Sequence, residues 1–325
     1  MTLAPAAIEP PIYPIELQWA DLSAYRRSNT GIDHVHSIDS GVAGPHVMVN
    51  ALTHGNELCG MVAVRRLLDA GVRPRIGRLT LSFANVDAYD LFATGQLHAR
   101  CVDRDFNRLW HDELLAADHT SVEGRRAHTL LPIVRTVDRL LDLHSTWHAV
   151  LPFFVLSRLP RTQRLADALA VPARQLLLPA FRHEGYHLID YGAFAEPDAE
   201  AVGLIAECGQ HFSASSAAQA WQVALRFLHV AGMLSDDDAC ELGLAPLGLG
   251  AVARYEIVQP VIATTDRMRL ACSYGGFVTF KAGEIAAYDG DAPVVAPFDD
   301  AVVLAPRPDP AAGQQAFAWG RELPT

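Results

Sequence analysis

The chain has 325 residues, of which half are hydrophobic and 19% are charged, and its formal net charge is -11. This length and apolar content allow a sizeable buried core, as one large domain or a main domain with a smaller one, and exclude a disordered chain. The negative charge argues against nucleic acid or an anionic membrane as partner, because phosphate-rich surfaces recruit lysine and arginine.

The cysteines and the N-terminus indicate the compartment. The five cysteines show no CxxC spacing, which is typical of reduced thiols in the cytoplasm. The N-terminus lacks a basic segment followed by an apolar run, and no stretch approaches the roughly 20 apolar residues that span a bilayer. We therefore expect a soluble, cytoplasmic protein without a membrane partner. A homo-oligomer is compatible with the sequence.

Between about residues 45 and 235, apolar runs alternate with segments of helical period. Buried strands are expected at 45–52, 78–86, 152–157 and 201–209, and a further strand should end at residue 146. Helices are expected at 57–71, 123–134 and 215–234. This alternation predicts an α/β fold with a mixed, mostly parallel sheet and helices on both faces.

The composition changes after the acidic segment 235–240. Short runs of valine, isoleucine and phenylalanine at 254–264, 277–290 and 293–306 are separated by glycine, proline and aspartate. We expect a catalytic domain over 1–240, with residues 1–40 as an N-terminal arm carrying one edge strand. A small all-β domain is expected over 241–325.

The most informative motif is His54-Gly55-Asn56-Glu57, which lies where a predicted strand ends and a predicted helix begins. A histidine and a glutamate three residues apart across such a turn can point at one metal ion, and Gly55 allows the tight turn. The HxxE spacing alone is common by chance. Its place at the carboxyl end of a parallel strand strengthens it, because open α/β sheets bind ligands there.

A second histidine follows another apolar run, in Asp142-Leu143-His144-Ser145. With His54 and Glu57 it completes a His2Glu set of zinc ligands that leaves one position for water. Asp142 is either an acidic turn residue or a carboxylate that orients a metal ligand.

The segment 100–108, RCVDRDFNR, concentrates charge. It is either a solvated, salt-bridged loop or an anion-binding site, since arginine binds a carboxylate through paired hydrogen bonds.

Glu207 lies at the end of a strand whose other residues are apolar. An unpaired carboxylate is costly there, so Glu207 needs either an arginine partner or a catalytic role. Cys208, its neighbour along the strand, should point to the opposite face, into the core.

The ordered motifs HGNE, RCVDRDFNR, DLHS and AECGQ resemble the succinylglutamate desuccinylase/aspartoacylase family, a branch of the zinc carboxypeptidase-like fold. The resemblance implies one zinc ion per chain, held by His54, Glu57 and His144. It implies that Glu207 is the catalytic base for the zinc-bound water. Arg100 matches the arginine that polarises the scissile carbonyl, and Asn107 and Arg108 match the pair that binds the substrate carboxylate.

The chain departs from the family at two places. Asp-Phe-Asn stands where Asp-Leu-Asn is common, and residues 298–309 lack the tyrosine that the aspartoacylase branch uses to contact substrate. The pocket for the acyl group should therefore differ.

The leading hypothesis is a zinc-dependent deacylase that cleaves the amide of a small N-acyl amino acid or similar N-acylated amine bearing a carboxylate. The alternatives are carboxypeptidase-like cleavage of a peptide or peptidoglycan fragment, and a catalytically silent zinc protein that binds a metabolite. A pure binder needs neither the base Glu207 nor Arg100, which favours an enzyme.

Overall fold

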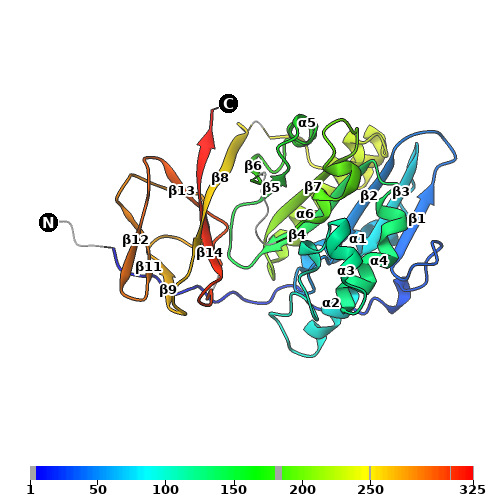
Figure 1. The fold of residues 1–325 in the computed structure, drawn as a ribbon. Helices are drawn as coiled ribbons and strands as arrows, with labels where there is room; N and C mark the ends of the chain where they lie inside the picture. The colour runs from blue at the N-terminus through cyan, green and yellow to red at the C-terminus, as the bar shows by residue number, and fades with distance from the viewer. Residues whose placement is uncertain (1–4, 180–184, 249, 308, 325) are drawn as a thin grey trace.

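The computed structural model describes residues 5–179, 185–248, 250–307 and 309–324. Within them, one large sheet runs through the molecule in the strand order β1-β3-β2-β4-β7-β5-β6-β8-β14-β13-β10 (Figure 1). The first eight strands in that order are β1 (Val35–Asp39), β3 (Arg78–Phe83), β2 (His46–Ala51), β4 (Arg139–Thr146), β7 (Val202–Gln210), β5 (Phe153–Leu156), β6 (Arg174–Leu177) and β8 (Ala253–Ile262).

The centre of this sheet is mostly parallel. Strands β3, β2, β4 and β7 run parallel to one another, β1 pairs antiparallel at the edge, and β5 pairs antiparallel to β7. Every residue of β2 is buried, as expected for a strand covered on both faces. The predicted α/β class and the N-terminal edge strand are confirmed.

Helices cover both faces of the sheet. The helices are α1 (Leu58–Asp69), α2 (Val86–Ala93), α3 (Asp112–Ala117), α4 (Val122–Val134), α5 (Pro160–Leu169), α6 (Ala214–Val230) and α7 (Asp236–Glu241). Helices α1, α5 and α6 share one apolar core with one face of the sheet, and α3 and α4 share a second core with the other face.

The strands after residue 250 form the expected small antiparallel β region. They are β8, β9 (Met268–Leu270), β10 (Val278–Phe280), β11 (Ile285–Asp289), β12 (Ala292–Val295), β13 (Ala301–Leu304) and β14 (Gln315–Leu323). Strand β8 pairs with β6, so the large sheet continues into this region, while β12, β11 and β9 form a separate sheet. A domain boundary near residue 240 stays a prediction.

The N-terminal arm connects the two regions and runs along one side of the molecule (Figure 1). At one end the Ile8 N–H donates to the Leu270 carbonyl at 2.7 Å. At the other end the Glu16 and Leu17 N–H groups donate to the Phe212 carbonyl. The Glu16 carboxylate accepts from the Ala214 N–H at 2.7 Å, which places a negative charge at the start of α6, where the helix dipole favours it.

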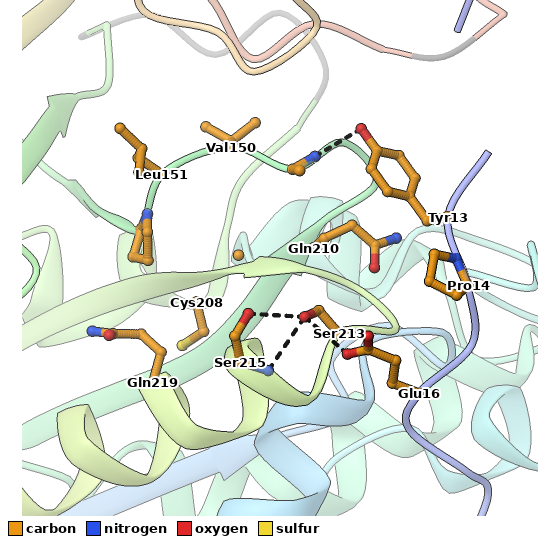
Figure 2. Close-up of a pocket in the computed structure, with 13 residues that line it drawn as sticks. Tyr13, Pro14, Glu16, Val150, Leu151, Cys208, Gln210, Ser213, Ser215 and Gln219 are labelled. Atoms are coloured by element: carbon orange, nitrogen blue, oxygen red, sulfur yellow. Dashed lines mark hydrogen bonds between the residues drawn. The ribbon is translucent and has the colours of Figure 1, made fainter. Parts of the chain in front are cut away.

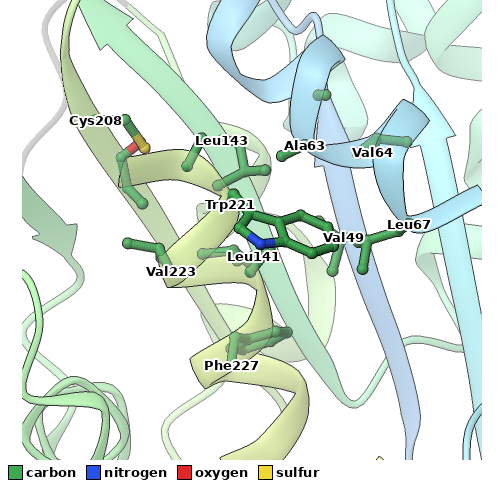
Figure 3. Close-up of a cluster of buried hydrophobic side chains, with 14 of the residues drawn as sticks. Val49, Ala63, Val64, Leu67, Leu141, Leu143, Cys208, Trp221, Val223 and Phe227 are labelled. Atoms are coloured by element: carbon green, nitrogen blue, oxygen red, sulfur yellow. The ribbon is translucent and has the colours of Figure 1, made fainter. Parts of the chain in front are cut away.

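The larger core lies between the sheet and helices α1 and α6 (Figure 3). Val49, Leu141 and Leu143 from adjacent parallel strands face Trp221 and Phe227 of α6, and Leu141 and Leu143 are fully buried. Cys208 lies in the same core, as its alternation with Glu207 predicts. This packing holds β4 and β7 against α6.

Truncation of Leu141 tests this core. We expect Leu141→Ala to lower the free energy of unfolding by about 2–5 kcal/mol, because the deleted atoms leave a cavity that the sheet and α6 cannot close. Val42→Ala, at a side chain that is 54% exposed, is the matched control and should change it by less than about 0.5 kcal/mol. Urea unfolding of the two variants measures the difference, and equal effects would contradict the packing described.

Candidate active site

Polar side chains gather at the carboxyl ends of β2, β4 and β7. In the sheet register Asn50 lies beside Asp142, and His144 lies beside Glu207. In-register neighbours on parallel strands point to the same face, so these side chains line one side of the sheet. All four lie at the edge where parallel α/β sheets bind ligands.

The turn that follows β2 is tightly constrained. Leu52 is buried with φ +58°, a left-handed conformation that costs energy for a residue with a side chain. At Gly55, a Cβ would lie 2.3 Å from the backbone of Ala88 in α2, so only glycine fits. This turn carries His54 inward and places Glu57 just before α1.

The Glu57 carboxylate lies between two imidazole rings. Its Oε1 is 2.8 Å from His54 Nδ1, and its Oε2 is 2.8 Å from His144 Nδ1. All three side chains are at most 3% exposed. Burial alone would raise the pKa of Glu57, but the two histidines outweigh it and hold that pKa well below its usual value.

A second carboxylate faces the far nitrogen of each ring. His54 Nε2 lies 3.0 Å from Asp105 Oδ1, and His144 Nε2 lies 2.8 Å from Asp142 Oδ2. Asp142 is held in turn by Asn50 and Thr53, which both donate to its Oδ1. Asp142 therefore takes the orienting position that the sequence left as one of two alternatives.

These contacts fit a metal site. The ligand atoms of His54, Glu57 and His144 lie within 4.8 Å of one another, and all three residues are buried. Each ring is oriented by a carboxylate on its Nε2, the arrangement that commonly supports metal-binding histidines. Burial would lower the pKa of His144, but the carboxylates of Asp142 and Glu57 outweigh it and raise that pKa well above its usual value. The surroundings of the ring are therefore negative enough to favour a positive charge at this position. Two imidazoles and one carboxylate form a donor set typical of zinc.

Arg100 lies at the edge of this cluster. Its Nε donates to Asp105 Oδ2 at 3.0 Å, and its Nη1 donates to Glu57 Oε1 at 3.3 Å. The side chain keeps 40% of its surface exposed, which leaves part of the guanidinium open to a ligand. The segment around it is thus a structured loop turned toward the cluster.

Glu123 of α4 organises the backbone of this loop. Its buried carboxylate accepts hydrogen bonds from the Val102, Asp103 and Arg104 N–H groups at 2.7–3.1 Å, and from Asn85 Nδ2. Sequence reasoning missed this contact because the partners are about 20 positions apart along the chain. No local pattern in the sequence distinguishes Glu123 from an ordinary helical glutamate.

Asn107 and Arg108 follow in a short 3-10 turn, η2 (Phe106–Arg108). The Asn107 N–H donates to Asp105 Oδ1, and its side-chain Oδ1 accepts from the Leu188 N–H at 2.8 Å. This contact orients the amide so that Nδ2 is its donor end. Arg108 Nη1 donates to the Asn107 carbonyl at 3.0 Å. The loop therefore joins both residues to the cluster through Asp105.

The side chain of Glu207 differs from the other carboxylates of the site. Its Oε2 is buried and has no hydrogen-bond partner among the described residues. Burial, together with the charge of Glu57, raises its pKa to about 8, although His144 and Arg100 oppose the shift. A carboxyl group held in this way beside a metal-ligand cluster is a strong candidate for a proton-transfer role.

Two further histidines lie near β4 and β7. The Ser145 N–H donates to Glu57 Oε2 at 3.2 Å, and its hydroxyl lies 2.8 Å from His211 Nδ1. Burial lowers the pKa of His211 to about 4, so this ring is neutral near pH 7. His148 contacts the Tyr13 and Tyr274 rings instead, away from the cluster.

A pocket of about 440 Å³ lies on the other face of β7 (Figure 2). Cys208 and Gln210 contribute to its floor, and Tyr13, Pro14 and Glu16 of the N-terminal arm close one side. Because neighbouring residues on a strand point to opposite faces, this pocket does not receive Glu207. It is distinct from the metal-ligand cluster.

Comparisons with known proteins identify the family and the fold of the chain. The family model described as the succinylglutamate desuccinylase/aspartoacylase catalytic domain matches residues 43–230. The chain belongs to this family. The matched segment contains the His-Glu-His cluster, the loop around Arg100 and Glu207. No curated protein matches the chain.

Several solved structures share the fold. A succinylglutamate desuccinylase from Vibrio parahaemolyticus is 20% identical, with 90% of this chain and 87% of that chain covered and a TM-score of 0.65. A succinylglutamate desuccinylase/aspartoacylase from Rhodobacter sphaeroides is 18% identical over 92% and 93%, with a TM-score of 0.66. Murine aminoacylase 3 is 20% identical, with 86% of this chain and 96% of that chain covered and a TM-score of 0.59.

Among the described residues, no helix is both long and apolar enough to cross a bilayer.

The metal site is tested by removing one ligand. We expect His144→Ala to hold less than about 0.1 equivalent of zinc after dialysis, because two remaining ligands bind the ion weakly. His148→Ala removes a buried histidine four positions away that does not contact the cluster, and it should retain zinc. Elemental analysis measures both, and full zinc in His144→Ala would refute the assignment.

The raised pKa of Glu207 predicts a pH-dependent cost to stability. An ordinary glutamate titrates near 4.5, but folding raises the Glu207 value to about 8, so the folded protein keeps a proton that the unfolded chain loses. Stability is therefore lost progressively as pH rises from about 4.5 to about 8. In metal-free protein, Glu207→Gln should raise the Tm little at about pH 5 and clearly above about pH 8. The exposed substitution Glu113→Gln is the control, and a Glu207→Gln effect independent of pH would contradict the account.

Proposed function

We propose that the protein is a zinc-dependent hydrolase that cleaves the amide bond of an N-acyl amino acid, or of a similar N-acylated amine bearing a carboxylate. One zinc ion per chain would be held by His54, Glu57 and His144. The observation that carries the proposal is Glu207, a carboxyl with an unpartnered buried oxygen beside His144 in the register of the sheet. A site built only to hold a metal does not need that group.

When bound, zinc supplies a Lewis acid that makes water more acidic, toward a pKa of about 7, and its charge favours ionised Glu207. Asp105 and Asp142 hold the two histidine rings in place for this ion. Neither carboxylate can move freely, because Asp142 is bound by Asn50 and Thr53, and Asp105 by Arg100.

Glu207 moves the proton. In its ionised form it takes a proton from the attacking water, and it then returns that proton to the nitrogen of the leaving amine. Its surroundings suit both steps, because burial favours the protonated form while Arg100 and His144 favour the ionised form. A base with opposing influences of this kind can accept and release a proton near neutral pH.

Arg100 stabilises the charge that develops on the carbonyl oxygen. Its guanidinium is anchored by Asp105 and Glu57 and keeps an exposed portion for the substrate. A donor fixed in advance is effective because it does not reorganise during the reaction, and its removal typically costs about 10²–10³ in rate.

Asn107 and Arg108 bind the substrate carboxylate. The Leu188 contact presents Nδ2 of Asn107 as a donor, and Arg108 adds a positive charge in the same turn. The negative net charge of the whole chain does not prevent binding of a carboxylate, because Asn107 and Arg108 act on it through short-range hydrogen bonds and a local positive charge. A small molecule is therefore the proposed partner, in place of nucleic acid or a membrane. Cysteines free of disulfides among the described residues support a cytoplasmic location.

The proposal is tested by following amine release from N-acetyl, N-formyl and N-succinyl amino acids and from short peptides. Zinc-loaded protein should hydrolyse acylated amino acids, and a chelator should abolish the reaction. Glu207→Gln should lower kcat by at least about 10³ while keeping full zinc, because proton transfer is lost and the ligands are unchanged. Glu113→Gln, an exposed glutamate in α3, should retain normal activity.

The outcomes separate the alternatives. Cleavage of peptides alone would assign a carboxypeptidase-like activity. Full zinc without turnover on any substrate would favour the silent metabolite-binding protein. Normal activity in Glu207→Gln would remove the general-base role.

A further inference from the structure

The pairing of β4 with β7 becomes irregular at the carboxyl ends of the two strands. His144 pairs with Glu207. The next pair is Thr146 with Gln210, so β7 has one residue more than β4 in this interval. Gly209, inside the interval, has φ +119°, a backbone conformation that glycine adopts readily. An extra residue of this kind forms a β-bulge, which is rare between parallel strands, redirects side chains and is common beside active sites.

After the bulge, the chain places His211 against Ser145. The His211 N–H donates to the Thr146 carbonyl at 2.9 Å, and the ring Nδ1 lies 2.8 Å from the Ser145 hydroxyl. Both side chains are buried, with 4% of His211 and 3% of Ser145 exposed. Among the described residues, neither this nitrogen nor the hydroxyl has another hydrogen-bond partner. Each group therefore depends on the other, because a buried polar atom without a partner is costly.

Ser145 also contacts Glu57. Its N–H donates to Glu57 Oε2 at 3.2 Å. The same carboxylate oxygen lies 2.8 Å from His144 Nδ1, and the other oxygen faces His54. Ser145 thus holds the carboxylate with its backbone and is itself held by His211 at its side chain. One residue connects the segment after β7 to the candidate metal ligand before α1.

Aromatic rings hold His211 in its orientation. The Trp147 indole packs edge-on against it, with ring centroids 5.8 Å apart, and the Phe212 ring lies at 5.9 Å. Trp147 is stacked in turn on His98, with ring centroids 4.4 Å apart. Packing of this kind restricts the rotamers of a buried side chain, so the His211 nitrogen stays directed at Ser145.

We propose that His211 is a positioning residue for the zinc site: through Ser145 it holds the Glu57 carboxylate in the orientation in which that group would bind the ion. The inference rests on the proposed function, because it needs Glu57 to be a metal ligand. The two histidine ligands are each supported by an aspartate, and the Ser145–His211 pair supplies the corresponding support to the third ligand. Loss of a group that orients a metal ligand typically weakens metal binding about 10- to 100-fold.

The test measures the zinc dissociation constant by competition with a chelator. We expect His211→Phe, which keeps a buried ring but removes the bond to Ser145, to weaken zinc binding about tenfold. His211→Asn places an amide near the position of Nδ1 and should recover most of the affinity, because an amide can donate or accept. Ser145→Ala should weaken binding as much as His211→Phe. The double variant should be no weaker than either, because both substitutions remove the same bond.

A neighbouring side chain separates positioning from a general loosening of the segment. Gln210 Nε2 donates to the Trp147 carbonyl at 3.1 Å, and its Oε1 accepts from the Phe212 N–H at 2.8 Å. Gln210→Met removes these bonds without touching the Ser145–His211 pair. It should lower the Tm of the metal-free protein at least as much as His211→Phe does, and leave the zinc dissociation constant within about twofold.

Zinc binding by His211→Phe within about twofold of the wild type, equal weakening in Gln210→Met, or additive losses in the double variant would overturn the inference and leave the deacylase proposal standing. A wild type that binds zinc but hydrolyses no acylated amine would overturn the proposed function and not this inference. A wild type that binds no zinc would overturn both.

Discussion

The Glu57 carboxylate, held between His54 and His144, is the contact on which the arrangement of the site depends. It joins the turn after β2 to the end of β4. Negative charge predominates there, because Asp105 and Asp142 add two more carboxylates. Such a group of buried acids and imidazoles is costly unless a cation balances it, so its conformation is coupled to metal binding.

The rest of the fold maintains that contact. The core around Leu141 and Leu143 packs the parallel strands against α6, and the register of β4 and β7 puts Glu207 beside His144. Glu123 fixes the loop that carries Arg100 toward Glu57. The arrangement of the site thus follows from the register of the sheet and from the buried Glu123, which holds the loop that carries Arg100.

Much of this could be predicted from sequence. Long apolar runs ending in polar motifs identified the parallel strands, and the family resemblance, now shown, assigned roles to residues that the structure brings together. Some elements were missed: β6 has only four residues, and the apolar part of β14 is followed by the mostly polar residues Gly320, Arg321 and Glu322. Periodicity cannot resolve such segments.

The supporting contacts of the site were also beyond sequence reasoning. Asp105 lay within a recognised motif, yet its bond to His54 spans 51 positions. Glu123 acquires its significance only from the loop that it contacts, and no local pattern distinguishes it from an ordinary charged residue. The C-terminal β region presented a similar difficulty, because only the turn before β10 shows that Phe277 reaches Phe153.

The most direct test of the account is a crystal structure of the zinc-loaded protein, with anomalous scattering recorded at the zinc edge. The account predicts one peak per chain, with histidine nitrogens and the Glu57 oxygen at about 2.0–2.2 Å and an open position facing Glu207. A peak that involves other side chains, or a fourth protein ligand closing that position, would contradict it.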